Sequence, residues 1–160
     1  MKTLLIYDSV YGNTEKIAQA IGEVLRSRDE VTILKAIDVK PEHFSNVTLL
    51  IVGSPTQAFS STSPIKKFIT NIPKQGLKGV NVATFDTRIA IEDIDSRILP
   101  TMVKLFGYAA KPIADSLGKK GGKLIIAPEG FFVKGTEGPL KEGELERAAG
   151  WAEQILATLA

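Results

Sequence analysis

Short apolar runs without polar alternation are the feature that most restricts the fold of this chain. Two of them, at Thr3–Tyr7 and Val47–Val52, are only five or six residues long. A strand with one face in water alternates apolar and polar residues, whereas a strand covered on both faces is apolar throughout. Strands covered on both faces are typical of parallel sheets that lie between two layers of helices. The chain is therefore predicted to be an α/β protein.

Helical patterns alternate with the strand candidates along the chain. Three more strands are predicted at residues 31–36, 80–85 and 123–127. Apolar residues at helical spacing predict helices at residues 17–25, 65–72 and 145–159. Ser63 is expected to cap the second of these helices, and Pro64 suits its first position. Because strands and helices alternate, the chain is predicted to form βαβ units that share one parallel sheet.

One long connection, from Arg88 to Leu117, separates the fourth and fifth predicted strands. Asp95 is expected to cap a helix with an apolar face at residues 99–106, and Pro112 is expected in the first turn of a second helix. The apolar face of the first helix fits three roles, which are a cover for the sheet, a lid over a ligand and the contact face of a homodimer. The residues leave these roles open.

The composition excludes several kinds of site. The chain has no cysteine, which excludes disulfides, thiolate metal sites and a cysteine nucleophile. His43 is the only histidine, so a histidine-based triad and a metal site with several histidines are both excluded. We therefore expect no metal and no catalytic side chain, and any redox chemistry would belong to a cofactor.

Length, charge and hydropathy predict one soluble domain. The 160 residues suit a single core, so we expect one domain over residues 1–160. The net charge is only +2 and the charges are mixed along the sequence, which predicts no nucleic-acid partner. No apolar stretch approaches the ~20 residues of a membrane span, and no signal peptide is recognisable, so a cytoplasmic location is expected.

The loop after the first predicted strand has the composition of a phosphate site. It consists of Ser9, Val10, Tyr11, Gly12, Asn13 and Thr14, and a predicted helix follows directly. Ligands of open parallel sheets bind at the carboxyl ends of the strands, where backbone N–H groups and a helix N-terminus attract anions. Gly12 allows a tight turn. The residues alone leave open whether the loop binds phosphate or only turns the chain and caps the helix.

Two other nucleotide motifs do not fit this loop. A P-loop requires the pattern GxxxxGK[ST], and no lysine stands at the matching place. A dinucleotide fingerprint requires GxGxxG, of which only Gly12 is present. The loop therefore favours a phosphate that is bound by hydroxyl, amide and backbone groups without lysine or arginine.

The run from Leu5 to Ile21 resembles the signature of flavodoxins. An aliphatic–aromatic strand end is followed by Ser9, Gly12 and Thr14, and the helix then carries alanine and a closing aliphatic residue. The Gly-Ser-Pro-Thr loop at 53–56 and the series of five strands are similar to this family as well. The resemblance implies a flavodoxin-like, doubly wound, three-layer fold with a five-stranded parallel sheet in the order 2-1-3-4-5. It also implies FMN as the cofactor, with its phosphate at the loop that contains Ser9 and Thr14.

The resemblance further implies that the flavin ring lies between the loops after the third and fourth strands. The implied contacts are Pro55, Thr56, Gln57, Ala58 and Phe59 in the first loop and Asp86, Thr87 and Arg88 in the second. Gln57 stands where electron carriers of the family often have tryptophan. Phe59 suits either the flavin ring or the core, and Tyr108 is a second candidate for stacking.

Arg88 departs from the acidic surroundings that are typical of the flavin in flavodoxins. A cation within ~4–6 Å of the flavin would favour its negatively charged reduced form. We therefore hypothesise that Arg88 raises the two-electron potential relative to acidic carriers. The alternative is a surface salt bridge between Arg88 and Asp86, Glu92 or Asp93.

Three functions are compatible with this sequence. The first is an FMN-binding electron carrier that serves a reductase and an acceptor protein. The second is an FMN-dependent NAD(P)H oxidoreductase that acts on a quinone or another small acceptor. The third is a binding module that keeps the fold without the flavin. The resemblance favours the electron carrier.

Overall fold

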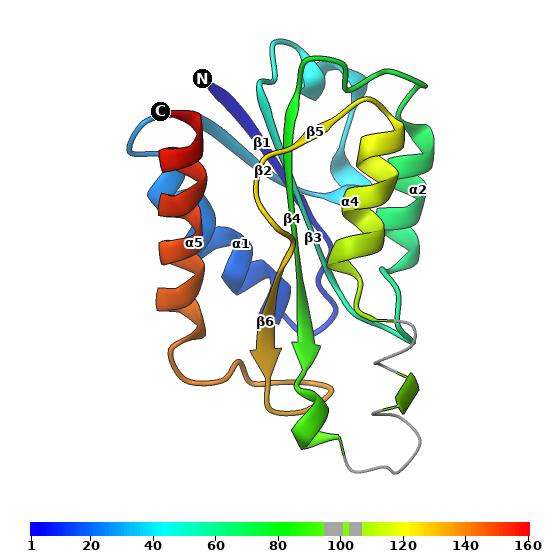
Figure 1. Cartoon of the computed structure of the whole chain (residues 1–160), viewed down its shortest axis with the longest axis vertical. Helices are drawn as coiled ribbons and strands as arrows, with labels where there is room; N and C mark the ends of the chain where they lie inside the picture. Colours follow the sequence, from blue (N-terminus) through cyan, green and yellow to red (C-terminus); the bar gives the residue numbers. More distant parts are fainter. Residues whose placement is uncertain (95–100, 103–106) are drawn as a thin grey trace.

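A parallel sheet forms the centre of the computed structural model, which describes residues 1–94, 101–102 and 107–160 (Figure 1). Its strands are β1 (Lys2–Tyr7), β2 (Glu30–Lys35), β3 (Leu49–Pro55), β4 (Asn81–Ile89), β5 (Lys123–Leu124) and β6 (Glu129–Val133). The order is β2-β1-β3-β4-β5, β6 also pairs with β4, and every pair is parallel. The predicted α/β fold and the strand order 2-1-3-4-5 are confirmed.

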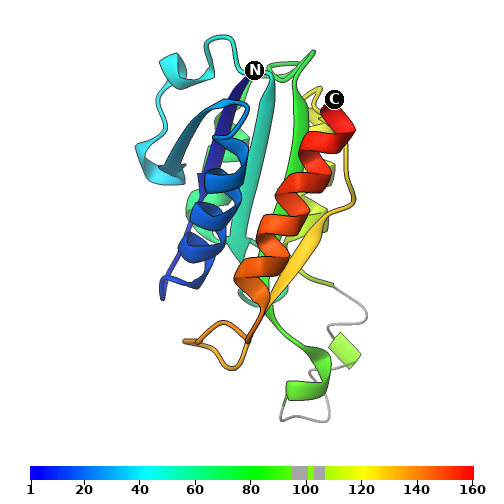
Figure 2. The same ribbon diagram turned by 90° about the vertical axis from the view of Figure 1, so that its left-hand side faces the viewer.

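Helices cover both faces of this sheet (Figures 1 and 2). They are α1 (Asn13–Leu25), α2 (Ser63–Asn71), α4 (Ala110–Lys119) and α5 (Glu144–Leu159), with short 3₁₀ turns at Ala36–Asp38, Pro41–Phe44 and Ile91–Asp93. The helices α1 and α5 lie on one face, and α2 and α4 lie on the other. None of the helices in the described ranges is long and apolar enough to cross a membrane.

Each face of the sheet has its own apolar core. On the face of α1 and α5, the rings of Phe85, Phe131 and Trp151 meet edge to face, with centroids 6.0 to 6.2 Å apart. Edge-to-face contacts of this kind stabilise a core beyond the burial of their area. A Cβ at Gly53 would lie 2.1 Å from the ring of Phe85, so this close approach requires a residue without a side chain. The strands β1 and β3 are buried on both faces, as their apolar runs predict.

The fifth position of the sheet differs from the prediction. A single strand was expected at 123–127, but β5 ends at Leu124 and the chain returns to the sheet only at Glu129, where β6 begins. Leu124 pairs with Val82 and Glu129 pairs with Phe85, so four residues bulge out opposite two residues of β4. Pro128 lies in this bulge and has no N–H group to donate to the sheet. Both strands pair with β4, one after the other, and together fill the place of one strand.

One predicted helix start needs correction. Ser63 is the first residue of α2 rather than its cap, which is Thr62, and Pro64 stands second. The helix α4 begins at Ala110, so Pro112 is its third residue and lies in its first turn, as predicted. The helix expected at 99–106, with its cap Asp95, falls in a segment of which the structure describes only residues 101 and 102.

The outer edge of β6 is covered by the chain that follows it. Lys134 donates its backbone N–H to Pro139 O at 2.9 Å, and Lys141 donates to Phe132 O at 2.8 Å. On α5, the buried carboxylate of Glu144 accepts the N–H of Phe132 at 2.7 Å. The edge of β6 therefore has partners for hydrogen bonds that an open edge strand would leave to another molecule.

Glu144 is also paired with a cation one turn along α5. Arg147 donates to both carboxylate oxygens of Glu144, at 2.9 and 2.8 Å, and its guanidinium lies 4.6 Å from the ring centroid of Phe131. Burial raises the pKa of Glu144, but the hydrogen bonds from Arg147 and from the N–H of Phe132 outweigh burial and hold this pKa below its ordinary value. The ionised carboxylate is therefore the form that the folded chain favours.

We expect Glu144→Gln to lower the free energy of unfolding at pH 7 by about 1–2 kcal/mol, because it removes a charge-assisted hydrogen-bond partner. A carboxyl with a depressed pKa contributes stability above its unfolded pKa and loses it as the pH falls. The variant should therefore lose less stability than the wild-type chain when the pH falls below 4.5, the ordinary value for this group. Urea unfolding at pH 7 and at acid pH measures both effects, with the exposed neighbour Glu146→Gln as the control. Equal pH dependence in the two variants would contradict this role.

Candidate functional site

A cavity of about 370 Å³ opens at the carboxyl ends of β1, β3 and β4. Eleven of the predicted site residues line it, namely Ser9, Val10, Tyr11, Asn13, Thr14, Pro55, Thr56, Gln57, Ala58, Thr87 and Arg88. Three predicted residues, Gly12, Phe59 and Asp86, do not line it but belong to the same three loops. The volume lies in the range of ~300–1,000 Å³ that is usual for small-molecule sites.

Ile89, Val133 and Thr136 also line the cavity, and sequence reasoning missed them. The predicted strand ended at residue 85, whereas β4 continues to Ile89 at the cavity. The other two lie at and just after the end of β6. The apolar run at 131–133, with a glycine on either side at 130 and 135, was the signal for this strand.

The loop between β1 and α1 is organised around the hydroxyl of Ser9. Its Oγ accepts the N–H of Gly12 at 3.1 Å and the N–H of Glu15 at 3.3 Å. A serine hydroxyl has two acceptor lone pairs and one hydrogen, so these contacts leave its hydrogen for another acceptor. Gly12 caps α1 with a φ of 89°, a left-handed conformation that favours glycine. The loop is therefore fixed in a shape that presents donors to the cavity.

Backbone amides around Ser9 add to this set of donors. Within the described part of the chain, the N–H groups of Val10, Tyr11, Asn13 and Thr14 donate to no other protein group. Asn13 and Thr14 are the first two residues of α1, where the helix carries a partial positive charge. Free N–H groups at a helix N-terminus form a binding site for anions.

A buried tyrosine holds the carboxylate of Glu15, which follows this loop. Tyr7 donates its hydroxyl to Glu15 Oε1 at 2.6 Å. Burial and the hydrogen bond to Glu15 raise the pKa of Tyr7 well above its ordinary value, so its hydroxyl remains protonated and keeps donating. In the chain, Glu15 comes directly after Asn13 and Thr14, whose backbone amides are free. Its hydrogen bond with Tyr7, the last residue of β1, fixes the position of its carboxylate.

Hydrogen bonds through Thr87 join the three loops. The hydroxyls of Thr14 and Thr87 lie 2.8 Å apart, and the N–H of Thr56 donates to Thr87 O at 2.9 Å. Thr14 and Thr87 are buried, so these contacts form away from competing water. The walls of the cavity are therefore connected to one another at their base.

A tight turn carries Ala58 and Phe59 at the edge of the cavity. Gln57 and Ser60 exchange backbone hydrogen bonds of 2.8 and 2.9 Å, and the two residues between them have φ values of 45° and 66°. Two successive positive φ values are what a type I′ turn requires, and residues other than glycine adopt them at a cost. The turn directs Gln57 and Ala58 toward the cavity, whereas Phe59 is not among the lining residues.

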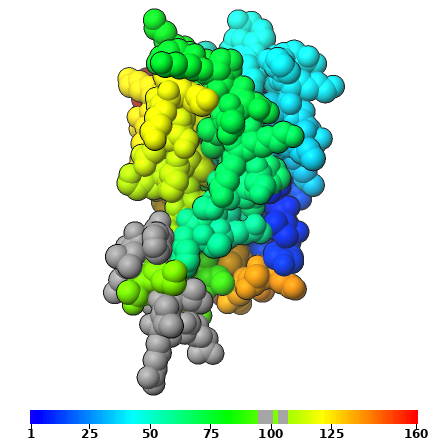
Figure 3. Space-filling view, turned by 90° about the vertical axis from the view of Figure 1, so that its right-hand side faces the viewer, coloured from blue at the N-terminus to red at the C-terminus, as the bar shows by residue number. Residues whose placement is uncertain are grey.

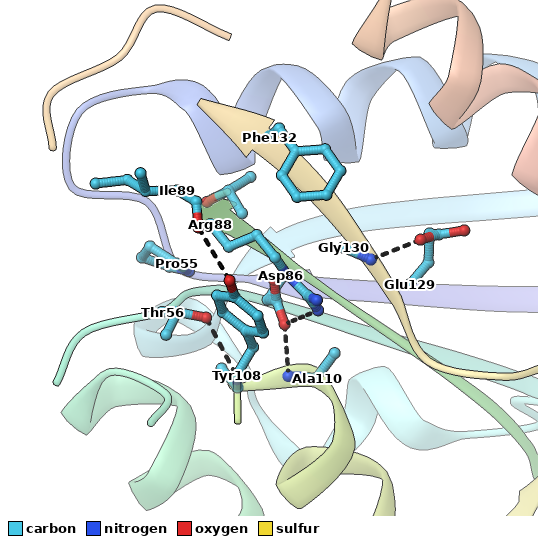
Figure 4. A network of polar contacts seen from close by, with 12 residues as sticks. Pro55, Thr56, Asp86, Arg88, Ile89, Tyr108, Ala110, Glu129, Gly130 and Phe132 are labelled. Carbon is cyan, nitrogen blue, oxygen red and sulfur yellow. Dashed lines mark hydrogen bonds and ion pairs between the residues drawn. The ribbon is translucent and has the colours of Figure 1, made fainter. Parts of the chain in front are cut away.

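Arg88 lies in a buried ion pair beside the cavity (Figure 4). It donates to the two carboxylate oxygens of Asp86 at 2.6 and 2.7 Å, and Asp86 also accepts the N–H of Ala110 at 2.9 Å. Burial raises the pKa of Asp86, while Arg88 and Ala110 act in the opposite direction. The predicted Arg88–Asp86 pair is present, although it is buried rather than a surface salt bridge. The hypothesis that Arg88 raises the two-electron potential of a bound flavin stays a prediction.

The guanidinium of Arg88 is also fixed between two other residues. Its Cζ lies 3.9 Å from the ring centroid of Tyr108, whose hydroxyl donates to Ile89 O at 3.1 Å. On the other side, a Cβ at Gly130 would lie 2.1 Å from Cζ of Arg88. Tyr108 thus stacks on Arg88 (Figure 4) and is not among the residues that line the cavity, and its contact with a flavin ring stays a prediction.

Comparisons with known proteins identify the relatives of this fold. A family model described as flavodoxin domain matches residues 4–128, and no curated protein matches the chain. A flavodoxin from the domain Archaea has a TM-score of 0.78 and 21% identity, with both chains covered completely. Flavodoxin 2 from Bacillus cereus has a TM-score of 0.78 and 23% identity, over 98% of this chain and 99% of the other. Flavodoxin 1 from Bacillus cereus has a TM-score of 0.76 and 15% identity, over all of both chains.

We expect Gly130→Ala to destabilise the protein by about 1–3 kcal/mol, because the added methyl group would displace a guanidinium that is held on its other sides. Gly150→Ala is the matched control, since a Cβ at this position in α5 meets no atom within 4 Å. This control should stabilise the helix by up to about 1 kcal/mol. Urea unfolding of both variants, followed by the fluorescence of Trp151, compares them directly. Equal stabilities would show that the close approach of Arg88 to Gly130 is unimportant.

Proposed function

Because the chain belongs to the flavodoxin domain family, we propose that it binds FMN in the cavity and carries electrons between two protein partners. Proteins of this family typically bind FMN. The observation that carries the proposal is the group of donors at the β1–α1 loop, which combines the hydroxyl of Ser9 with four free backbone amides. These donors suit a phosphate group that ends a longer ligand.

In this proposal the loop from Ser9 to Thr14 holds the phosphate of FMN. Ser9 donates its remaining hydrogen, the amides of Val10, Tyr11, Asn13 and Thr14 donate theirs, and the N-terminus of α1 contributes its partial charge. Arg88 does not serve the phosphate, because its charge is already paired with Asp86. Hydrogen bonds to a charged oxygen are stronger than those to a neutral one, so this set does not require a lysine or arginine.

The remainder of the cavity suits a flat, largely apolar ring with polar edges. Pro55, Ala58 and Ile89 line it with apolar groups, and Thr56 and Gln57 add polar ones. When it is bound, FMN supplies the electron chemistry, and the chain positions it and limits its contact with water. The fixed turn at 57–60 and the hydrogen bonds of Thr87 favour a site that exists before the ligand arrives.

Two exposed side chains on the cavity wall support a role in contact with partner proteins. Val10 and Tyr11 line the cavity, yet they remain 51% and 52% exposed. An apolar and an aromatic residue at the rim of a cofactor site form a surface that a second protein can cover during electron transfer. We expect a reductase and an acceptor protein to use this rim.

We expect Ser9→Ala to weaken FMN binding about ten- to hundred-fold, because it removes a hydrogen bond to a charged phosphate and leaves two loop amides without their acceptor. Riboflavin has the same ring without the phosphate, and its affinity should not change. Quenching of flavin fluorescence measures both affinities. Ser27→Ala, an exposed serine after α1, is the control and should bind both flavins like the wild-type chain.

Three outcomes would contradict the proposal. An equal loss of FMN and riboflavin affinity in Ser9→Ala would mean that the loop does not hold the phosphate. Failure of the wild-type chain to bind FMN would favour the flavin-free binding module. Steady oxidation of NADH or NADPH by the FMN-loaded chain with a small acceptor, in the absence of other proteins, would favour an oxidoreductase over a carrier.

A further inference from the structure

Lysines gather at the end of the molecule opposite the cavity. The segments 72–80 and 117–124 together contain five lysines, which are Lys74, Lys78, Lys119, Lys120 and Lys123, and they contain no acidic residue. The whole chain has a net charge of only +2, so the remaining residues are net negative. We call these two segments the basic pole. The lysines look dispersed in the sequence, but the fold concentrates them.

Hydrogen bonds hold the two segments of the basic pole together. Leu77 donates its N–H to Lys120 O at 3.0 Å, and Lys120 Nζ donates to Ile72 O at 2.7 Å. Both segments lead into strands, 72–80 into β4 and 117–122 into β5, so they lie at the amino end of the sheet. Figure 3 shows the first segment in green next to the end of α4 in yellow, on one face of the molecule.

The charges of the basic pole are available to another molecule. Lys74, Lys78, Lys119 and Lys123 are exposed, and none of them forms an ion pair with the residues that the structure describes. Leu124 stands beside Lys123 and leaves 43% of its surface in water. The pole therefore combines several unbalanced positive charges with an exposed apolar side chain.

The composition of the basic pole favours a lipid surface over a nucleic acid. Neither segment contains an aromatic residue on which bases could stack, and neither contains an arginine for paired contacts to base edges. Lysine is a flexible point charge that suits phosphate headgroups, and clusters of lysines bind anionic membranes through the negative surface potential. Leu124 can enter the interface between headgroups and acyl chains.

We propose that the basic pole binds the surface of membranes that contain anionic phospholipids. The cavity lies at the carboxyl ends of the strands, so a chain bound by its basic pole keeps the cavity and the exposed residues Val10 and Tyr11 turned toward the solvent. Attachment at one end and electron exchange at the other do not compete. This binding does not depend on FMN.

Sedimentation with lipid vesicles tests the proposal on the whole chain. We expect binding to vesicles of equimolar phosphatidylcholine and phosphatidylglycerol, no binding to phosphatidylcholine alone, and release in about 1 M salt, where the Debye length is ~3 Å. Removing four charges with K74Q/K78Q/K119Q/K123Q should reduce binding about ten-fold or more. Lys120 is left in place because it holds the two segments together.

The matched control removes four exposed positive charges away from the amino end of the sheet. K35Q/K66Q/K67Q/K134Q has the same net charge as the first variant and should bind vesicles like the wild-type chain. An equal loss in both variants would overturn the proposal, because it would show that only net charge matters. Absence of wild-type binding to the anionic vesicles would overturn it as well. Tighter binding to a duplex DNA oligonucleotide than to the vesicles would replace the lipid surface with a nucleic acid.

Discussion

The burial of β1 and β3 on both faces is the constraint on which the rest of the structure depends. Side chains without exposure to water on either face hold these strands parallel and in register between the two helical layers. Their carboxyl ends then lie side by side, and the polar residues that follow them must meet there. The hydroxyl contact between Thr14 and Thr87 and the bond from Thr56 to Thr87 are consequences of this alignment. The cavity is thus a product of the sheet rather than of any one loop.

Electrostatics divides the molecule into three regions with different roles. At the cavity, the charge of Arg88 is balanced by Asp86, so neutral donors and a helix N-terminus remain to attract an anion. At the edge of the sheet, Glu144 and Arg147 neutralise each other while they fix β6 to α5. At the opposite end, the lysines of the basic pole have no such partners in the described ranges. The Asp86–Arg88 and Glu144–Arg147 pairs therefore serve the fold, and the exposed lysines of the basic pole remain for binding.

Local patterns were enough to predict the parallel sheet and the polar loop at Ser9–Thr14, and the resemblance to flavodoxins added the strand order, whereas contacts between distant segments could not be predicted. The apolar runs of β1 and β3 and the composition of Ser9–Thr14 are properties of neighbouring residues. The break between β5 and β6 depends on how the chain meets β4, so Val133 was missed. The place of Arg88 depends on Gly130, which lies forty-two residues further along the chain. The basic pole likewise forms only when two separate loops meet.

The central claim is that the β1–α1 loop holds the phosphate of FMN with hydroxyl and amide donors and without a cation. The most direct test is a fluorescence titration of the wild-type chain with FMN at low salt and at about 1 M salt, where exposed charges are screened beyond ~3 Å. The account predicts one FMN per chain, with an affinity that changes little between the two conditions. A steep loss of affinity in high salt would show that lysine or arginine side chains hold the phosphate, and would contradict the account.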